Sequence, residues 1–117
     1  GKPAAFAQDP AAQRLATAGV EQGVDRGLIP AQRAFFYLPF EHAEDLKLQR
    51  AGVRLFERIA TEVAPAWRKE YASFADYAGL HRDIVERFGR FPHRNKMLGR
   101  ASTPEEIEFL KQPGSSF

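Results

Sequence analysis

Apolar side chains recur at intervals of three and four residues along this chain, and prolines or glycines separate the stretches in which they do so. This spacing places the apolar side chains on one face of an α-helix, whereas a half-buried strand needs alternation with a period of two. No stretch of useful length alternates in that way. The pattern therefore predicts an all-α fold.

Capping residues and prolines mark where the predicted helices begin and end. Asp9-Pro10 and Pro30 are typical of helix starts, and Thr103 with Glu106 makes a capping box around Pro104. The third helix stops before Pro65. The predicted helices cover residues 9–27, 30–38, 40–63 and about 74–88, with a short last helix from 104.

Short connections between helices favour antiparallel hairpins, which build helical bundles and helical-repeat folds. At 117 residues the chain is large enough for one core and too small for two. We therefore expect a single helical domain over residues 1–117. It would comprise an N-terminal extension at 1–8, a helical core at 9–112 and a flexible tail at 113–117.

The composition limits the chemistry and the compartment. With no cysteine, the chain has no disulfides, thiolate zinc sites or cysteine nucleophiles. No apolar run approaches the roughly 20 residues that cross a bilayer, and the first residues lack the apolar core of a signal peptide. These features predict a cytoplasmic protein that does not enter a membrane. A formal net charge of +2 is too small to indicate nucleic-acid binding.

Positive charge and imidazole are concentrated in residues 81–100. This stretch holds five arginines, one lysine, two of the three histidines and only two acids, Asp83 and Glu86. Clustered arginines attract phosphates and carboxylates, which they bind in a bidentate manner. Phe91 could stack on a nucleic-acid base, but one aromatic ring among six cations is weak evidence for nucleic acid as a partner.

The segment Arg90-Phe91-Pro92-His93-Arg94-Asn95 follows a helix end and is stiffened by its proline. Loops held in this way on a helical scaffold commonly carry binding groups. Its cations could bind an anion together with Arg100, and His93 could act as an acid or a base near neutral pH. The structural alternative is that the arginines cap helix carbonyls and pair with Asp83, Glu86 or Glu105.

The other two histidines lie near carboxylates or on an apolar face. His42 and Asp45 are three residues apart, so on one helix they would point the same way, and the carboxylate could fix the tautomer of the imidazole or share a metal ion with it. Glu41 and Glu44 form a second three-apart pair on an adjoining face. The alternative is a solvated helix start. His81 is either a core residue or a ligand or general base. If His42 and His81 meet, they form a metal site with Asp45. The sequence leaves the metal and any cofactor unidentified.

The common hydrolase templates find no support in the sequence. It contains no glycine-rich phosphate loop, nucleophile elbow or His-Glu-x-x-His motif. None of its serines lies in a sequence motif typical of a catalytic nucleophile.

Two long segments resemble a known family. They are Tyr-Leu-Pro-Phe-Glu-His-Ala-Glu-Asp at 37–45, and Phe-Gly-Arg-Phe-Pro-His-Arg-Asn at 88–95 continued by Leu-Gly-Arg-Ala-Ser-Thr-Pro-Glu-Glu at 98–106. With Ala-Phe-Ala-Gln-Asp at 5–9, they resemble the bacterial family called domain of unknown function 924 over essentially the whole chain. The resemblance implies an all-helical, tetratricopeptide-like fold and says little about activity.

The resemblance also implies a shared constellation of side chains. Members of that family usually carry further helices before the point where this chain starts, including a segment Asp-Gln-Phe-Pro-Arg-Asn. We therefore expect a chain that is truncated, assembled with a second copy or inactive. The family's motif positions are occupied here by His42, Glu44, Asp45, His81, Arg90, His93, Arg94, Asn95 and Arg100.

Three functional hypotheses follow. The first is a binding module that holds a small anionic ligand or a peptide carboxylate through its arginines, with Glu44 and Asn95 beside them. The second is a metal-assisted hydrolase. The third is a structural protein that covers an exposed apolar face by forming a homo-oligomer. The binding module would use Arg90, Arg94 and Arg100, and the hydrolase would use His42, Asp45, His81 and His93.

Overall fold

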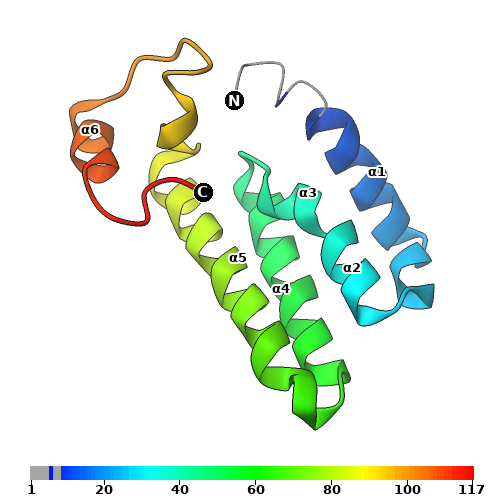
Figure 1. The fold of residues 1–117 in the computed structure, drawn as a ribbon. Helices are drawn as coiled ribbons and strands as arrows, with labels where there is room; N and C mark the ends of the chain where they lie inside the picture. The colour runs from blue at the N-terminus through cyan, green and yellow to red at the C-terminus, as the bar shows by residue number, and fades with distance from the viewer. Residues whose placement is uncertain (1–5, 7–8) are drawn as a thin grey trace.

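The computed structural model describes residue 6 and residues 9–117, and the regular structure in this part of the chain is helical. Figure 1 shows α4 and α5 as a long hairpin, with α2 and α3 between this hairpin and α1. The all-α prediction is confirmed, whereas the tetratricopeptide-like arrangement stays a prediction. The helices are α1 (Asp9–Glu21), α2 (Pro30–Phe36), α3 (Leu38–Glu41), α4 (Leu46–Glu62), α5 (Arg68–Phe88) and α6 (Pro104–Leu110).

Several predicted helix boundaries are correct because local chemistry sets them. α2 begins at Pro30 and α6 at Pro104. In the capping box of α6, the backbone N–H of Glu106 donates to the Thr103 hydroxyl at 3.1 Å, and the Thr103 N–H donates to the Glu106 carboxylate at 2.9 Å. Gly89 ends α5 with a left-handed φ of 72°, a conformation that glycine adopts without steric cost.

Other predicted boundaries are wrong. The first helix does not reach residue 27 but ends at Glu21, since Gly23 has a φ of 75° and a 3₁₀ turn, Val24–Gly27, follows. The third helix does not begin at residue 40. The chain instead forms the one-turn helix α3, bends, and starts α4 at Leu46. The fourth begins at Arg68 rather than near residue 74.

The bend between α3 and α4 is fixed from both sides. Asp45 is the N-cap of α4, and its side chain accepts a hydrogen bond from the Leu48 N–H at 3.1 Å. Gln49, which is 1% exposed, donates to the carbonyls of Glu41 and Ala43 at 2.7 Å each. These bonds set the direction in which α3 presents its last residues.

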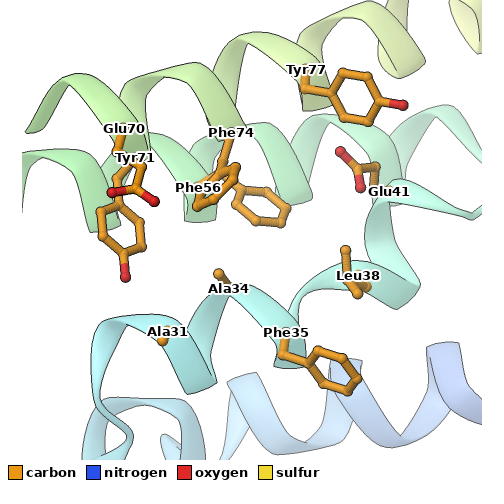
Figure 2. A pocket seen from close by; sticks show the side chains of 10 residues that line it. All are labelled: Ala31, Ala34, Phe35, Leu38, Glu41, Phe56, Glu70, Tyr71, Phe74 and Tyr77. Atoms are coloured by element: carbon orange, nitrogen blue, oxygen red, sulfur yellow. The ribbon is translucent and has the colours of Figure 1, made fainter. Parts of the chain in front are cut away.

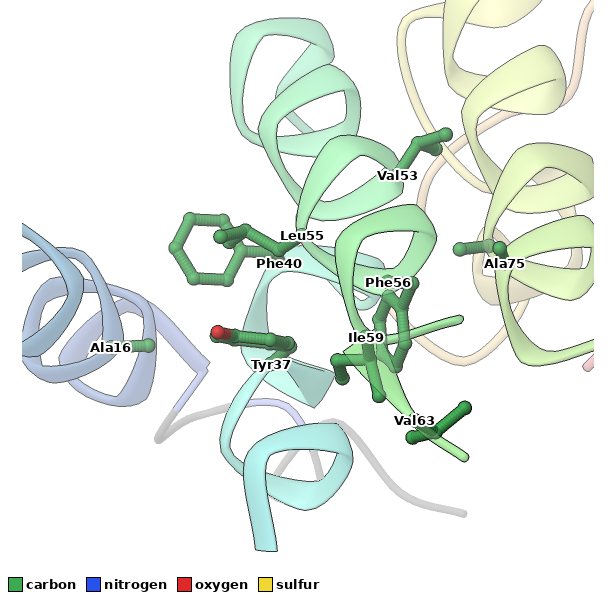
Figure 3. Packing of buried hydrophobic residues seen from close by; sticks show 10 residues of the cluster. Ala16, Tyr37, Phe40, Val53, Leu55, Phe56, Ile59, Val63 and Ala75 are labelled. Atoms are coloured by element: carbon green, nitrogen blue, oxygen red, sulfur yellow. The ribbon is translucent and has the colours of Figure 1, made fainter. Parts of the chain in front are cut away.

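The main core lies around α4, where α1, α3 and α5 contribute buried side chains and α2 packs against the cluster (Figure 3). Tyr37 and Ile59 are fully buried at its centre, and the Tyr37 ring meets Phe40 and Phe56 edge to face. The Tyr37 hydroxyl donates to the buried carboxylate of Asp25. Because α3 is anchored in this core, the residues at its end are held in a fixed place.

A smaller apolar cluster fixes the segment after α5. Phe91 is fully buried against Ile84 and Val85, and Phe88 of α5 packs on Phe109 of α6. This cluster ties residues 90–101 and α6 to the end of α5.

The predicted extension at 1–8 lies largely outside the described residues, and the predicted tail is described in full. Of the predicted extension at 1–8, the structure describes Phe6 alone. The segment 113–117 was expected to be flexible, but it folds back. Ser115 is buried and donates to the Leu110 carbonyl at 3.1 Å, and the ring of Phe117 stacks on His81. Within residues 9–117, no helix is long and apolar enough to cross a membrane.

Candidate functional site

A cavity of about 400 Å³ opens where the end of α3, the middle of α5 and the segment after α5 meet. The end of α3 contributes one wall. α5 contributes a second, and the 3₁₀ turn Pro92–Arg94 contributes a third. The residues that line the cavity are Phe6, Asp9, Glu41, His42, Tyr77, His81, Phe91, His93, Arg94, Met97 and Phe117.

The structure brings all three histidines to this cavity. His81 lies on the buried stripe of α5 and is 4% exposed, and His93 is half-buried in the 3₁₀ turn. His42 directly follows α3 and stays exposed at the rim. One cavity therefore joins imidazoles from three separate parts of the chain.

His81 is held as a neutral imidazole with one free nitrogen. Its Nδ1 lies 2.8 Å from the Tyr77 carbonyl oxygen, which can only accept, so Nδ1 carries the proton and donates it. Burial lowers the pKa of His81 to about 4, and the nearby His42, His93 and Arg94 add to this effect. At neutral pH the Nε2 lone pair is therefore available as an acceptor or a base.

Glu41 is a second titratable group in the cavity. Its carboxyl is buried, and Oε1 lies 3.8 Å from His81 Nδ1. Burial raises the pKa of Glu41 to about 7. A carboxyl group that titrates near neutral pH inside a cavity is a candidate general acid or base.

Arg94 is a buried cation that is only partly compensated. It is 8% exposed, and its Nη1 lies 3.8 Å from a carboxylate oxygen of Asp9. Its guanidinium carbon lies 4.7 Å from the ring centroid of Phe91 and 4.4 Å from that of Phe6. Burial lowers the pKa of Arg94, and Glu44 and Asp9 only partly oppose this effect.

Two buried nitrogen atoms at the cavity have no hydrogen-bond partner among the described residues. They are Nε of Arg94 and Nδ1 of His93. Burial lowers the pKa of His93, and Arg94 lowers it further. Because an unpaired buried polar group costs about 1–3 kcal/mol, these atoms indicate a place where a hydrogen-bonding partner would be stabilising. Nε of Arg94 can only donate, whereas Nδ1 of His93 donates or accepts according to its tautomer.

The other arginines of the predicted site already hold carboxylates. Arg90 forms a two-point ion pair with Glu106, at 2.9 and 2.7 Å, and donates to the Ala101 carbonyl at 2.8 Å. The hydrogen bond from Arg90 lowers the pKa of Glu106 to about 2, although burial opposes the shift. This pair holds the 90–101 segment against the start of α6.

Arg100 and Glu44 form a second network behind the cavity. Both ends of the Arg100 guanidinium lie 2.9 Å from the Glu44 carboxylate, and the Phe91 N–H donates to Glu44 at 2.7 Å. Arg100 also donates to Asn95 Oδ1 at 3.0 Å. Burial raises the pKa of Glu44, but the bonds from Arg100 and Phe91 outweigh burial and hold it below the ordinary value.

The partners expected for the loop arginines are therefore wrong. Asp83 pairs with Arg82, and Glu105 with Arg87, both on the surface. Glu86 lies 3.7 Å from Arg50. None of these acids pairs with Arg90, Arg94 or Arg100 among the ion pairs of residues 9–117.

The predicted pairing of His42 with Asp45 is also wrong. The two residues do not share a helix, since α3 ends at Glu41 and Asp45 caps the start of α4. Asp45 does not line the cavity. In residue 6 and residues 9–117, no group of three or more His, Asp and Glu side chains is placed to hold a metal ion.

The cavity also contains residues that the predicted site lacked. Glu41 lies one position before a predicted histidine, but only the fold shows that it is buried beside His81. Phe117 stacks on His81 with ring centroids 3.8 Å apart and also lies near His93. No local pattern indicates that a Gly-Ser-Ser-Phe segment would reach back to α5.

The sequence pattern of a family of bacterial proteins of unknown function, DUF924, matches residues 1–114. The chain belongs to this family. A solved structure of a protein of unknown function from Agrobacterium tumefaciens is similar to it, with a TM-score of 0.79 and 40% sequence identity. That likeness covers 95% of this chain and 57% of the Agrobacterium chain, so this DUF924 chain spans just over half the length of that structure. No curated protein matches the chain.

Proposed function

We propose that this protein binds a small carboxylate in the cavity, with Arg94 as the charge partner and His93 as a second donor. The main support is the buried Arg94 guanidinium, which lines the cavity and, among the described residues, has no hydrogen-bond partner for Nε and one ion-pair contact, to Asp9 at 3.8 Å. A ligand carboxylate would supply the missing acceptor and balance the charge. Charge-assisted hydrogen bonds of this kind are roughly twice as strong as neutral ones.

In this proposal the other predicted ligand-binding residues position the site. Arg90 and Arg100 are engaged with Glu106 and Glu44 and so have little capacity left for a ligand. Asn95 is fully buried and bonds to Arg100 and to Ser102. Together they hold Phe91 and the turn from which Arg94 and His93 reach the cavity.

The charges around the cavity favour a monoanion over a doubly charged phosphate. Arg94 is the strong cation there, and Asp9 already offsets part of its charge. His81 is neutral at pH 7, since burial holds its pKa near 4. A carboxylate needs one compensating charge, whereas a phosphate dianion would bring a second charge into a largely apolar space.

Calorimetric titration with acetate and with inorganic phosphate tests this proposal. Wild-type protein should bind acetate more tightly than phosphate, and Arg94→Ala should weaken acetate binding at least tenfold. Arg54→Ala, an exposed position on α4, is the matched control and should bind like the wild type. Near-ultraviolet circular dichroism shows whether Arg94→Ala keeps its packing, and Arg94→Lys provides a second variant that keeps the charge. Acetate binding that is unchanged in a folded Arg94→Ala would overturn the proposal.

An enzymatic role is a second candidate, supported by Glu41. Its carboxyl titrates near neutral pH, since burial raises its pKa to about 7, and it lines the same cavity as Arg94. A group of this kind could transfer a proton to or from a bound anion. Glu41→Gln should then abolish turnover while carboxylate binding is kept. The hypothesis of a metal-assisted hydrolase gains no such support, because Asp45 caps α4.

Self-association is a third candidate, supported by an apolar groove of about 460 Å³ between α2, α3 and α5. Figure 2 shows Ala31 and Ala34 of α2 facing Phe56, Tyr71 and Phe74 across this groove. Phe35 lies at its edge and is 77% exposed. Since one face carries both a groove and a protruding ring, two copies related by a two-fold axis could each place Phe35 in the partner's groove.

A further inference from the structure

The ring of Phe117 lies among four other aromatic rings in the cavity. It stacks on His81 with a centroid distance of 3.8 Å and an angle of 30° between the planes, and it meets Tyr77 edge to face at 5.5 Å. Phe91 and His93 lie 6.5 and 6.1 Å away, also at steep angles. We call the space that the Phe117 ring occupies between these four residues the ring slot.

The ring slot suits a planar aromatic ring better than an aliphatic group. One of its walls, the imidazole of His81, stacks on the ring it holds with 30° between the planes, and the other three meet that ring at steep angles. Offset stacking and edge-to-face contacts are the two arrangements that aromatic quadrupoles prefer. An aliphatic ring of the same size fills the space but gains neither interaction.

The ring slot adjoins the charged end of the cavity. Phe91 lies next to both, since its ring centroid is 6.5 Å from that of Phe117, with 72° between the planes, and 4.7 Å from the Arg94 guanidinium carbon. A ligand that places a ring in the slot could therefore direct an acid group on a flexible chain toward Arg94.

Phe117 is held in the slot by weak restraints. It is 40% exposed, and among residues 113–117 the one side-chain hydrogen bond to another residue joins Ser115 to the Leu110 carbonyl. Gly114, with a φ of 78°, makes the turn that brings Phe117 back. The ring can thus leave the slot without disturbing α5 or α6.

We infer that the ring slot selects carboxylates that carry an aromatic ring, and that Phe117 competes with the ligand's ring as an internal occupant. This inference rests on the proposed carboxylate site at Arg94. The ligand class includes free arylalkyl carboxylates and peptides that end in an aromatic residue, since both place a ring near a carboxylate.

An internal competitor lowers the apparent affinity by the fraction of time for which it leaves the slot empty. If Phe117 occupies the slot about 90% of the time, its removal should tighten the binding of aromatic carboxylates about tenfold. The same removal should leave acetate binding unchanged, because acetate has no group to place in the slot.

The experiment is a set of calorimetric titrations with matched acids. Phenylpropionate carries a planar aromatic ring and cyclohexylpropionate a puckered aliphatic one on the same chain, acetate lacks the ring, and N-acetyl-glycyl-phenylalanine presents an aromatic ring at a peptide end. Each is titrated into wild type, Phe117→Ala and Phe117→Leu, with Ile107→Ala as an exposed apolar control on α6. In NMR spectra, Phe117→Ala should also move the imidazole protons of His81 downfield, because the stacked ring no longer shields them.

Phenylpropionate should bind more tightly than cyclohexylpropionate, and more tightly still in both Phe117 variants. Tighter binding of the peptide than of phenylpropionate would assign the site to peptide ends. Tighter binding of phenylpropionate would assign it to free acids. Equal affinity for phenylpropionate and cyclohexylpropionate, or weaker binding of phenylpropionate by Phe117→Ala, would overturn the inference. If acetate binding still depended on Arg94, the proposed function would hold. Absence of binding by every acid would overturn both.

Discussion

The carboxyl group of Glu41 lies 3.8 Å from the imidazole of His81, and both side chains are buried although they come from different helices. Burial raises the pKa of Glu41 to about 7 and lowers the pKa of His81 to about 4. Near neutral pH the imidazole is therefore neutral and the carboxyl is about half protonated. The two groups do not form an ion pair, because each resists charging in the same apolar surroundings.

These two pKa shifts act on stability in opposite directions. For Glu41 the pKa rises from 4.5 to about 7 on folding, so the unfolded state releases its proton first and stability falls between those values. For His81 the pKa falls from 6.5 to about 4, so the unfolded state binds a proton first and stability rises from pH 4 to 6.5. We predict that Glu41→Gln, measured against the wild type, gains about 2 kcal/mol of unfolding free energy between pH 4.5 and 7.

Urea denaturation at several pH values would measure this difference. Glu57→Gln, an exposed position on α4, is the control and should follow the wild-type curve. If the curve of Glu41→Gln ran parallel to that of the wild type, Glu41 would have an ordinary pKa in the folded state.

The pair of Glu44 and Arg100 should matter far more to stability than the surface pair of Arg87 and Glu105. Glu44 accepts two bonds from Arg100 at 2.9 Å and one from the Phe91 N–H, and about three quarters of each charged side chain is shielded from solvent. Glu44→Ala leaves the Phe91 N–H without its acceptor and Arg100 without its carboxylate partner, and we expect a loss of about 2–3 kcal/mol. Glu105→Ala is the matched control and should cost less than about 1 kcal/mol. Denaturation curves that place the two losses at the same size would contradict this ranking.

What the sequence could predict depends on the range of the interactions. Helix starts such as Pro30 and Thr103-Pro104 are set by residues within one turn, and these predictions are confirmed. The partner of Arg100 is Glu44, which is distant in the sequence, so nothing near Arg100 could indicate it. Nearby acids such as Asp83 were the natural candidates, and the structure places them with other arginines.

Two local patterns were also open to more than one interpretation. Asp45 fits a His-x-x-Asp pair and equally fits an N-cap, and tertiary packing decides for the cap because Gln49 holds the preceding bend. The composition of residues 113–117 is typical of a mobile tail. In the structure, Phe117 instead packs in the ring slot between Tyr77, His81, Phe91 and His93. A slot assembled from two separate segments has no signature in either one.

Two glycines, Gly52 on α4 and Gly79 on α5, predict opposite effects of substitution by alanine. A Cβ at Gly52 would lie 2.7 Å from the Cβ of Phe40, and that atom cannot move away without moving α3. We expect Gly52→Ala to lower the unfolding free energy by about 1–3 kcal/mol. At Gly79 on α5 the nearest atom would be the flexible end of Arg82 at 3.7 Å, so Gly79→Ala should raise stability by up to about 1 kcal/mol. Thermal unfolding of both variants measures the contrast, and a stabilised Gly52→Ala would show that α3 does not pack on α4 in this way.

The apolar groove between α2, α3 and α5 predicts association of two copies through Phe35. This ring is 77% exposed beside the groove, so burying it in a partner's groove removes apolar surface from water in both copies at once (Figure 2). Wild-type protein should therefore elute earlier from gel filtration as its concentration rises, and Phe35→Ser should elute as a monomer at every concentration. Trp67→Ser is the matched control, since Trp67 is 57% exposed and does not line the groove. A wild-type monomer at both low and high concentration would refute the association, and loss of association in Trp67→Ser alone would move the contact to the turn between α4 and α5.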